Sequence, residues 1–135
     1  MPATIIDNLK TMLGTVAQIE RVYDDPPESL SEFPSAMVYT TGGEVGGMGS
    51  GNMREFHDLV IDIYSHRNVL PQAIDEAKIW PGIMFPKLIG DPTLTGAASA
   101  IDGEIQYISG PMEYGRDNTY YGVRFTLRYK KITTY

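Results

Sequence analysis

The chain contains no cysteine, which excludes disulfide bonds, thiolate metal ligands and a cysteine nucleophile. It also lacks any apolar run approaching the roughly 20 residues that a membrane-spanning helix requires, so we expect no membrane partner. No basic segment followed by a long apolar stretch stands near the start, so no secretory signal is expected. Stability must therefore come from packing or from association with other subunits.

Charge of either sign is scarce, and basic residues are the scarcer kind. Residues 1–115 hold 6 basic and 16 acidic side chains, a balance of −10, whereas 116–135 hold 5 basic and 1 acidic, a balance of +4. The overall net charge of −6 disfavours tight binding of nucleic acid, because affinity for phosphate comes from Lys and Arg. An acidic protein suits a surface that nucleic acid passes without adhering.

The length of 135 residues allows one domain, 1–135, with a hydrophobic core. Apolar residues at i, i+3 and i+4 predict a helix over 4–16, and Thr4 with Asp7 resembles a capping box. A second helix is predicted from Pro71 to about Ile79, where Pro81 and Pro86 forbid its continuation and leave only a short further turn. Alternation predicts strands over 18–23, 36–41, 55–65, 97–109 and 120–131, with loops over 24–35 and 110–119.

This order predicts an α+β fold, a mostly antiparallel sheet with the two helical segments packed on one face and a long glycine-rich hairpin loop. The opposite face would be charged. If 97–109 and 120–131 pair as a hairpin, Asp102 and Glu104 become cross-strand neighbours of Arg124 and Arg128.

Six glycines lie in the stretch TGGEVGGMGSGNM, residues 41–53. A P-loop requires a lysine and a Ser or Thr after its glycines, but Asn52 and Met53 follow here and 11–77 contain no lysine. A dinucleotide fingerprint requires its glycines between a strand and a helix, whereas the segment after these glycines alternates as a strand. The stretch is therefore interpreted as a hairpin tip of permissive backbone.

No catalytic, cofactor or metal site emerges from the remaining residues. His57 with Asp58 and Asp62 suggests a metal site, but the histidine and the two aspartates alternate onto opposite faces of a strand. Asp58 and Asp62 share a face, yet four residues of strand separate them by about 13 Å, too far for a pair of glycosidase carboxylates. They are interpreted as solvent-face or interface charges, and the protein is predicted not to be an enzyme.

The amino-acid sequence, taken segment by segment along the chain, resembles the phage tail terminator family, also called tail completion or minor tail proteins of the neck. The matching segments are, in order, IIDNLKTMLGTVAQIERVY, FPSAMVYTT, EFHDLVIDIYSHR followed by LPQAIDEA, LIGDPTLTGAAS, and YYGVRFTLRY. They cover nearly the whole chain as a pattern of apolar positions and turn residues. The chain departs from the family at Trp80, Pro81 and Pro86, where such proteins commonly have a longer helix, and in its unusually long glycine-rich tip.

The resemblance implies a homohexameric ring that caps the tail tube, ends tail polymerisation and presents a surface to head–tail connector or stopper proteins. DNA would pass through its lumen without specific binding. The protein would lie at the tail–neck junction of the virion, and in the host cytoplasm during assembly. An edge strand or loop of each subunit would engage its neighbour and the major tail tube protein, and ordering on binding would stop polymerisation. The expected tube-facing or lumen-facing residues are Gly42, Gly43, Gly46, Gly47, Gly49, Gly51 and Met53, and the expected subunit contacts are Arg124, Arg128 and Lys130.

Three other interpretations stay open at this point. A head-completion (stopper) or head–tail joining protein of the same neck has a similar size and similar elements. A small nucleotide-binding enzyme would use the glycine-rich loop. A generic α+β interaction module from bacteria would share the fold alone.

Overall fold

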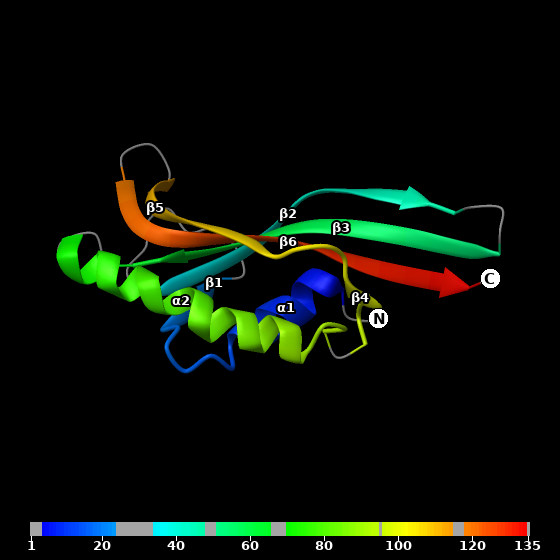
Figure 1. Cartoon of the computed structure of the whole chain (residues 1–135), viewed down its shortest axis with the longest axis horizontal. Coiled ribbons are helices and arrows are strands. Elements are labelled where there is room, and N and C mark those ends of the chain that lie inside the picture. Colours follow the sequence, from blue (N-terminus) through cyan, green and yellow to red (C-terminus); the bar gives the residue numbers. More distant parts are fainter. Residues whose placement is uncertain are drawn as a thin grey trace.

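The computed structural model describes residues 4–23, 34–47, 51–65, 70–94, 96–114 and 118–134. In chain order the elements are α1 (Ile5–Leu13), β1 (Arg21–Tyr23), β2 (Ser35–Gly46), β3 (Asn52–Tyr64), α2 (Leu70–Gly90), β4 (Ala100–Ile101), β5 (Gln106–Tyr114) and β6 (Asn118–Thr134). Figure 1 shows a long twisted sheet with both helices on one side of it. The predicted α+β class, the mostly antiparallel sheet and the two helices are confirmed.

One sheet holds all six described strands, in the order β1-β2-β3-β6, and β6 pairs on its other side with both β4 and β5. The β1–β2 pair is parallel, and the other pairs are antiparallel. The 17-residue β6 therefore joins three strands to one another. Its register with β3 is uninterrupted from Asn52 opposite Thr134 to Tyr64 opposite Gly122.

The hydrophobic core fills the space between the helices and one face of the sheet. Because β-strand side chains alternate, every second residue of β3 and β6 reaches this core. The sheet contributes Ala36, Val38, Leu59, Ile61, Ile63, Val123, Phe125, Leu127 and Tyr129, and the helices contribute Ile5, Leu9, Met12, Leu13, Trp80, Met84 and Leu88. The predicted alternation of 120–131 and the predicted apolar face of the first helix are confirmed.

The first helix begins as predicted but ends early. Thr4 caps it, and the Thr4 Oγ1 accepts a hydrogen bond from the backbone N–H of Asp7 over 3.1 Å. The helix ends at Leu13, and Gly14 follows as its C-cap, so the predicted extent to residue 16 is too long. The predicted strand over 18–23 is likewise reduced to Arg21–Tyr23, and residues 24–33 of the predicted loop lie outside the described residues.

The second helix contradicts the prediction that Pro81 ends it. α2 continues through Pro81 and Pro86 to Gly90. Each internal proline costs about 3 kcal/mol, but Trp80, Met84 and Leu88 recur at four-residue spacing and are fully buried. Burying three large apolar side chains contributes roughly 1.5–3 kcal/mol each, which offsets the cost of the two prolines. Tertiary packing thus overrides local propensity here.

The hairpin between β5 and β6 is tighter than predicted. Strand pairing reaches Tyr114 opposite Asn118, so most of the loop predicted over 110–119 is strand, and 115–117 lie outside the described residues. At Gly122 a Cβ would overlap the Ile63 carbonyl oxygen and lie 2.5 Å from the Met112 Cε. This position therefore requires glycine for the close approach of β3, β5 and β6.

Three strands extend beyond the helices. The segments 42–46 of β2, 52–57 of β3 and 130–134 of β6, here called the arm, pair with one another past the last core positions. Figure 1 shows the arm running away from α1 and α2 toward the C-terminus. The molecule thus consists of a two-layer body and a single-layer projection from it.

Candidate assembly surface

A carboxylate–guanidinium pair lies in the middle of the sheet face that the helices leave uncovered. Asp62 of β3 stands directly opposite Arg124 of β6. The Arg124 Nε donates to Asp62 Oδ1 over 2.8 Å, and Nη2 donates to Oδ2 over 3.1 Å. The Asp62 side chain has no exposed surface, whereas that of Arg124 is 41% exposed. The hydrogen bond with Asp62 raises the pKa of the Arg124 guanidinium, which therefore stays charged.

Two tyrosines complete the shell around this carboxylate. The Tyr39 and Tyr64 hydroxyls both donate to Asp62 Oδ2, the latter over 3.3 Å, and Tyr39 also accepts from Arg124 Nη2 over 3.1 Å. Burial, with the hydrogen bond to Asp62, raises the pKa of Tyr39 to about 12. Burial also raises the pKa of Tyr64. Both hydroxyls therefore remain donors, and the buried carboxylate is fully satisfied.

A second pair repeats this arrangement four residues closer to the arm. The Arg128 Nε and Nη2 donate to Asp58 Oδ1 and Oδ2 over 2.6 and 3.0 Å. Glu44 lies 4.0 Å from Arg128, whose guanidinium carbon stands 5.4 Å from the centre of the Phe56 ring. The hydrogen bond from Arg128 lowers the pKa of Asp58. Asp62 with Arg124 and Asp58 with Arg128 thus form two neighbouring ion pairs on the uncovered face, here called the ladder.

The partners of these arginines differ from the prediction. Asp102 and Glu104 were expected opposite Arg124 and Arg128, but β3, not the preceding segment, supplies the carboxylates. The predicted strand over 97–109 is in fact β4, a bend and β5, and the bend holds Asp102, whose backbone N–H donates to the Arg128 carbonyl over 2.8 Å. Both guanidinium groups bind carboxylates of their own chain. The role of Arg124, Arg128 and the partly exposed Lys130 as subunit contacts stays a prediction.

Much of the glycine-rich stretch is strand, so the predicted loop over 42–53 is wrong in its extent. Pairing continues from Gly42 opposite Asp58 to Gly46 opposite Arg54, and β3 begins at Asn52. A Cβ at Gly43 would overlap the Phe56 carbonyl oxygen, so glycine here permits close pairing rather than a loop. Of the expected tube-facing residues, Gly42, Gly43 and Gly46 lie in β2, Gly47 just after it, Gly51 in the turn before β3 and Met53 in β3, whereas Gly49 lies outside the described residues.

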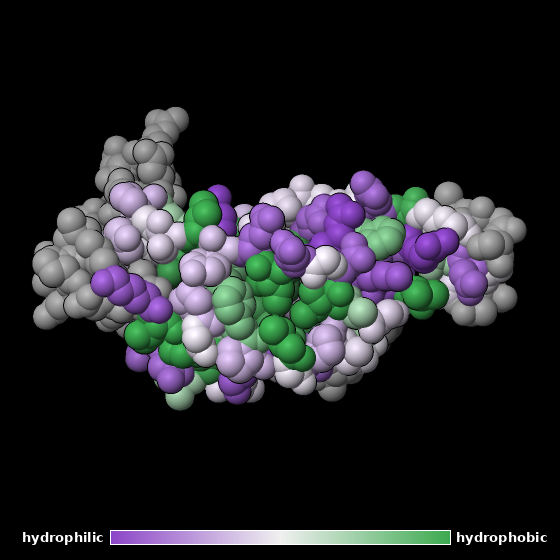
Figure 2. Space-filling model, viewed as in Figure 1, coloured by the Kyte–Doolittle hydropathy of each residue, from purple (hydrophilic) through white to green (hydrophobic). Residues whose placement is uncertain are grey.

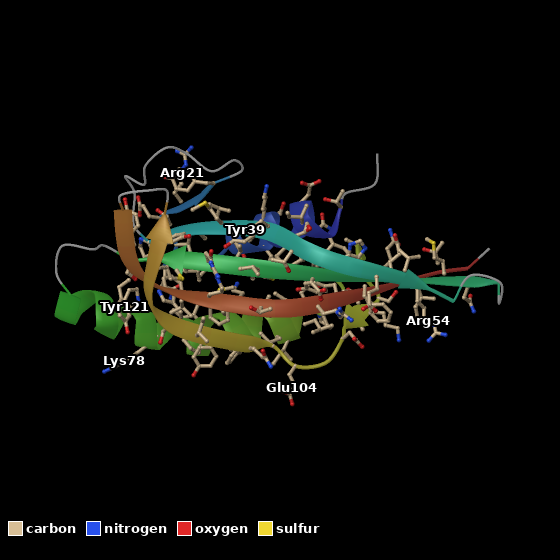
Figure 3. The ribbon with its side chains drawn as sticks, turned by 90° about the horizontal axis from the view of Figure 1, so that it is seen from above. Arg21, Tyr39, Arg54, Lys78, Glu104 and Tyr121 are labelled. Atoms are coloured by element: carbon tan, nitrogen blue, oxygen red, sulfur yellow. The ribbon has the colours of Figure 1, made fainter. Side chains whose placement is uncertain are left out.

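Both long edges of the sheet are open among the strands that the structure describes. β1 covers β2 only over Ser35–Met37, so the outer side of β2 from Val38 to Gly46, here called the β2 edge, has no strand beside it. The outer side of β5, Gln106–Tyr114, here called the β5 edge, is likewise open. Figure 3 views the uncovered face, with Tyr39 of β2 and Glu104, which precedes β5, on opposite sides of the sheet.

An apolar groove lies between α2 and the segment that leads into β5. It has a volume of about 600 Å³ and is lined mainly by apolar side chains, among them Phe85, Ile89, Ile101 and Ile105. Ile89 is 65% exposed. Figure 2 shows hydrophobic residues gathered where α2 meets this segment. The groove adjoins the β5 edge on the helix side of the sheet.

The predicted separation of His57 from Asp58 and Asp62 onto opposite faces of the strand is confirmed. His57 pairs with Gly43 and Tyr129 on the helix side of the sheet, opposite to the aspartates. Within the described ranges, no three His, Asp or Glu side chains gather closely enough to hold a metal ion. His66 lies outside those ranges. Neither described helix is long and apolar enough to cross a membrane.

No protein-family model matches the chain, and no curated protein matches it. The structure establishes a class of fold, an α+β protein whose described residues leave one sheet face uncovered by helices and two sheet edges unpaired, and form a projecting arm.

Sequence reasoning missed the ladder of ion pairs, although the signal was present. Asp58 and Asp62 are separated by four residues, and so are Arg124 and Arg128. Equal spacing on two antiparallel strands allows both pairs to form in one register, which the β3–β6 pairing realises. The contribution of Tyr39 and the apolar groove had no comparable signal, because both depend on which elements become neighbours.

Proposed function

We propose that this chain is a structural virion protein that caps a phage tail tube as a hexameric ring, ends tail polymerisation and joins the tail to the head connector. The observation that supports this most directly is the unfinished sheet. Open edges normally carry charges, prolines or covering elements that prevent pairing with other chains. A protein whose task is to assemble requires edges on which another chain can still pair. The arm adds a projecting surface with which to contact the tube.

The protein would act through assembly and not as an enzyme. Of the glycines that could have formed a phosphate loop, Gly42, Gly43 and Gly46 are paired in β2, and the strand β3, not a helix, follows the stretch. The uninterrupted α2 also agrees with the longer helix that the resemblance to tail terminators implies. These two features favour the assembly role over the small nucleotide-binding enzyme.

The electrostatics of the uncovered face support the proposed passage of DNA. Arg124 and Arg128 are the cations that phosphates would seek there, and both already bind carboxylates of the same chain. A ring with this face toward its lumen would present few unpaired positive charges, and the protein as a whole has a net charge of −6. DNA would therefore pass without specific binding.

The partners in this role are five further copies of the chain, the tail tube protein on one side of the ring, and the connector or stopper proteins on the other. The protein would occupy the tail–neck junction of the virion and, before assembly, the host cytoplasm. We expect the protein alone to be monomeric or weakly associated, and to form rings when tubes are supplied.

Deleting the gene from the phage tests the role. Loss of a terminator leaves tails of aberrant length, and the wild-type gene supplied in trans restores a uniform length. Normal free tails beside DNA-leaking heads would instead identify a head-completion protein and overturn the terminator role. Electron microscopy of lysates separates the two outcomes.

Purified components provide a second test. Tail tubes incubated with the protein should carry a ring at one end and should cease to grow, while a tube-only control continues to polymerise. A stable monomer that never binds tubes would contradict the proposal. Heat released on titration with nucleotides, and lost on substitution of Gly47, would support the enzyme interpretation instead.

A further inference from the structure

The two sheet edges carry few of the features that normally prevent edge-to-edge association: the β2 edge has a register shift at Thr41, and the β5 edge has Pro111. The β2 edge reads VYTTGGEVG, with Glu44 as its one charge, and the β5 edge reads QYISGPM before its first charge at Glu113. Neither contains a lysine or an arginine. Val45, Tyr107 and Ile108 are 55%, 48% and 68% exposed, so apolar side chains stand where protective charges would be expected.

We propose that the β2 edge of one copy of this chain pairs, antiparallel, with the β5 edge of the next copy, with Val45 opposite Tyr107 and Glu44 opposite Ile108. The proposal rests on the ring of the proposed function and specifies its subunit interface. A second copy is the occupant that the structure favours, because the two open edges lie on opposite sides of one sheet. β2 and β5 run in opposite directions within it, so side-by-side copies bring them together antiparallel.

The position of β1 limits the register in which β5 of one copy can pair with β2 of the other. β1 covers the outer side of β2 as far as Met37, so a neighbouring β5, which ends at Tyr114, has room only from Val38 onward. Beyond that limit, regular pairing is interrupted by the register shift at Thr41 of β2 and by Pro111 of β5, which has no N–H to donate, and these two positions stand level when Gly42 pairs with Gly110. The regular pairing is then 42–46 against 106–110.

The alternation of side chains is satisfied by this register. Antiparallel partners share a face of the sheet. Glu44 lies on the uncovered face, level with Phe56, and Ile108 lies there beside Arg124. Val45 and Tyr107 both point to the helix side, where Tyr107 stands 5.6 Å from Phe85, ring centre to ring centre. The register thus brings the exposed Val45 and Tyr107 into contact.

The offset also agrees with a closed ring. Counted across the paired strands of one copy, Glu44 stands level with residue 102. In the proposed register Glu44 stands opposite Ile108 of the neighbour, so the neighbour is displaced by about 6 residues, or about 20 Å, along the strands. The distance from one β2 to the next spans four strand spacings, or about 19 Å. The strands would then tilt by roughly 45° to the ring axis, close to the 35–45° of closed barrels.

Disulfide trapping tests the interface directly, because the chain has no cysteine of its own. The variants are Glu44→Cys, Val45→Cys, Tyr107→Cys and Ile108→Cys, each carrying one thiol. Adjacent antiparallel pairs alternate between wide and narrow spacing, so one of the two combinations places its Cβ atoms at the shorter distance. Lys78→Cys, on the exposed surface of α2, measures random collision.

Under mild oxidation, mixing Glu44→Cys with Ile108→Cys, or Val45→Cys with Tyr107→Cys, should give a reducible dimer well above the Lys78→Cys background. Each variant alone should stay at background, because a head-to-tail interface never brings identical positions together. The double variant Glu44→Cys/Ile108→Cys should give a ladder of oligomers that disappears in urea. Ser109→Lys, introduced into the β5 partner, should reduce the yield to background, whereas Thr126→Lys, an exposed position on the central β6, should not.

Background yield from both mixtures would overturn the proposal, and so would efficient linkage of Ile108→Cys to itself, which indicates a symmetric dimer. Circular dichroism of the reduced variants confirms folding, and the exposed 44/108 pair remains informative if Tyr107→Cys unfolds. Trapping uses this chain alone. Disulfide-linked oligomers that have no effect on tail tubes would therefore refute the proposed capping function but support the β2–β5 interface. Capped tubes without disulfide-linked oligomers would refute the interface but support the capping function.

Discussion

The buried carboxylate at the centre of the uncovered face permits a quantitative test of what holds the sheet together. In Arg124→Met the side chain keeps most of its length but loses its charge, and the fully buried Asp62 is left with two tyrosine hydroxyls and no cation. Removing one partner of a buried pair typically costs about 3–5 kcal/mol. Because Arg124 is 41% exposed and its attraction is partly screened, we expect about 2–3 kcal/mol.

The reverse change should be less harmful. In Asp62→Leu the arginine can extend into water and Tyr39, at the edge of the network, can be hydrated, while the buried Tyr64 hydroxyl loses its hydrogen bond to Asp62, so we expect a loss of about 1 kcal/mol. The double variant Asp62→Leu/Arg124→Met leaves no unpaired charge and should return to within about 1 kcal/mol of the wild type. The cycle therefore predicts a coupling energy of roughly 2–3 kcal/mol.

Urea unfolding followed by circular dichroism measures the free energy of unfolding of all four proteins. Thermal melting should show the same order, with Arg124→Met about 10 °C below the wild type for a chain of this size. If Asp62→Leu costs as much as Arg124→Met, or if the double variant is the least stable of the four, the argument from an isolated buried charge is refuted. The tyrosine hydrogen bonds would then be the main contribution of this site.

Three further outcomes are expected. Gly122→Ala should destabilise the protein by at least about 2 kcal/mol, because a Cβ there overlaps backbone, whereas Gly46→Ala, with open space around it, should be nearly neutral when both are unfolded in urea. The lowered pKa of Asp58, caused by its hydrogen bond with Arg128, contributes stability that is present above the unfolded value of 3.8 and is lost as the pH falls below it; Asp58→Asn should flatten the acid limb of the stability curve, and an unchanged limb would contradict this. The raised pKa of Tyr39 contributes stability that is complete below pH 10 and is lost as the pH rises toward about 12. In a pH titration followed by tyrosinate absorbance, Tyr39→Phe should therefore lack one of the tyrosines that ionise near pH 12 in the wild type.

Local patterns in the sequence predicted the elements whose structure is decided locally. The apolar face of α1 with its Thr4 cap, and the alternation along β6, depend on residues a few positions apart, and both were confirmed. The loop predicted for the glycine-rich segment was wrong in extent because its structure is not decided locally. Glycine permits a loop and close strand pairing equally, and the choice depends on β3, which lies beyond the turn.

The candidate assembly surface was only partly predictable. That Asp58 and Asp62 share a face, and that Arg124 and Arg128 do, followed from alternation alone. Which carboxylates meet which guanidinium groups depends on the order of strands, and β6 pairs on both sides, so two answers were possible. The continuation of α2 past its prolines likewise depended on a core that the local sequence does not display.

The central place of β6 has a consequence for how the protein comes to be made. Ribosomes deliver residues 118–134 after every other described strand, yet β3, β4 and β5 all require that strand as a neighbour. Until it emerges, β5 has no described partner, and β2 and β3 form a hairpin with one side vacant. Folding is therefore expected to finish late and slowly, as long-range pairing generally does, with the nascent chain exposing apolar strand surface meanwhile. A chain built in this way would not present a complete sheet, and so could not offer both of its edges to another copy, before residues 118–134 had left the ribosome.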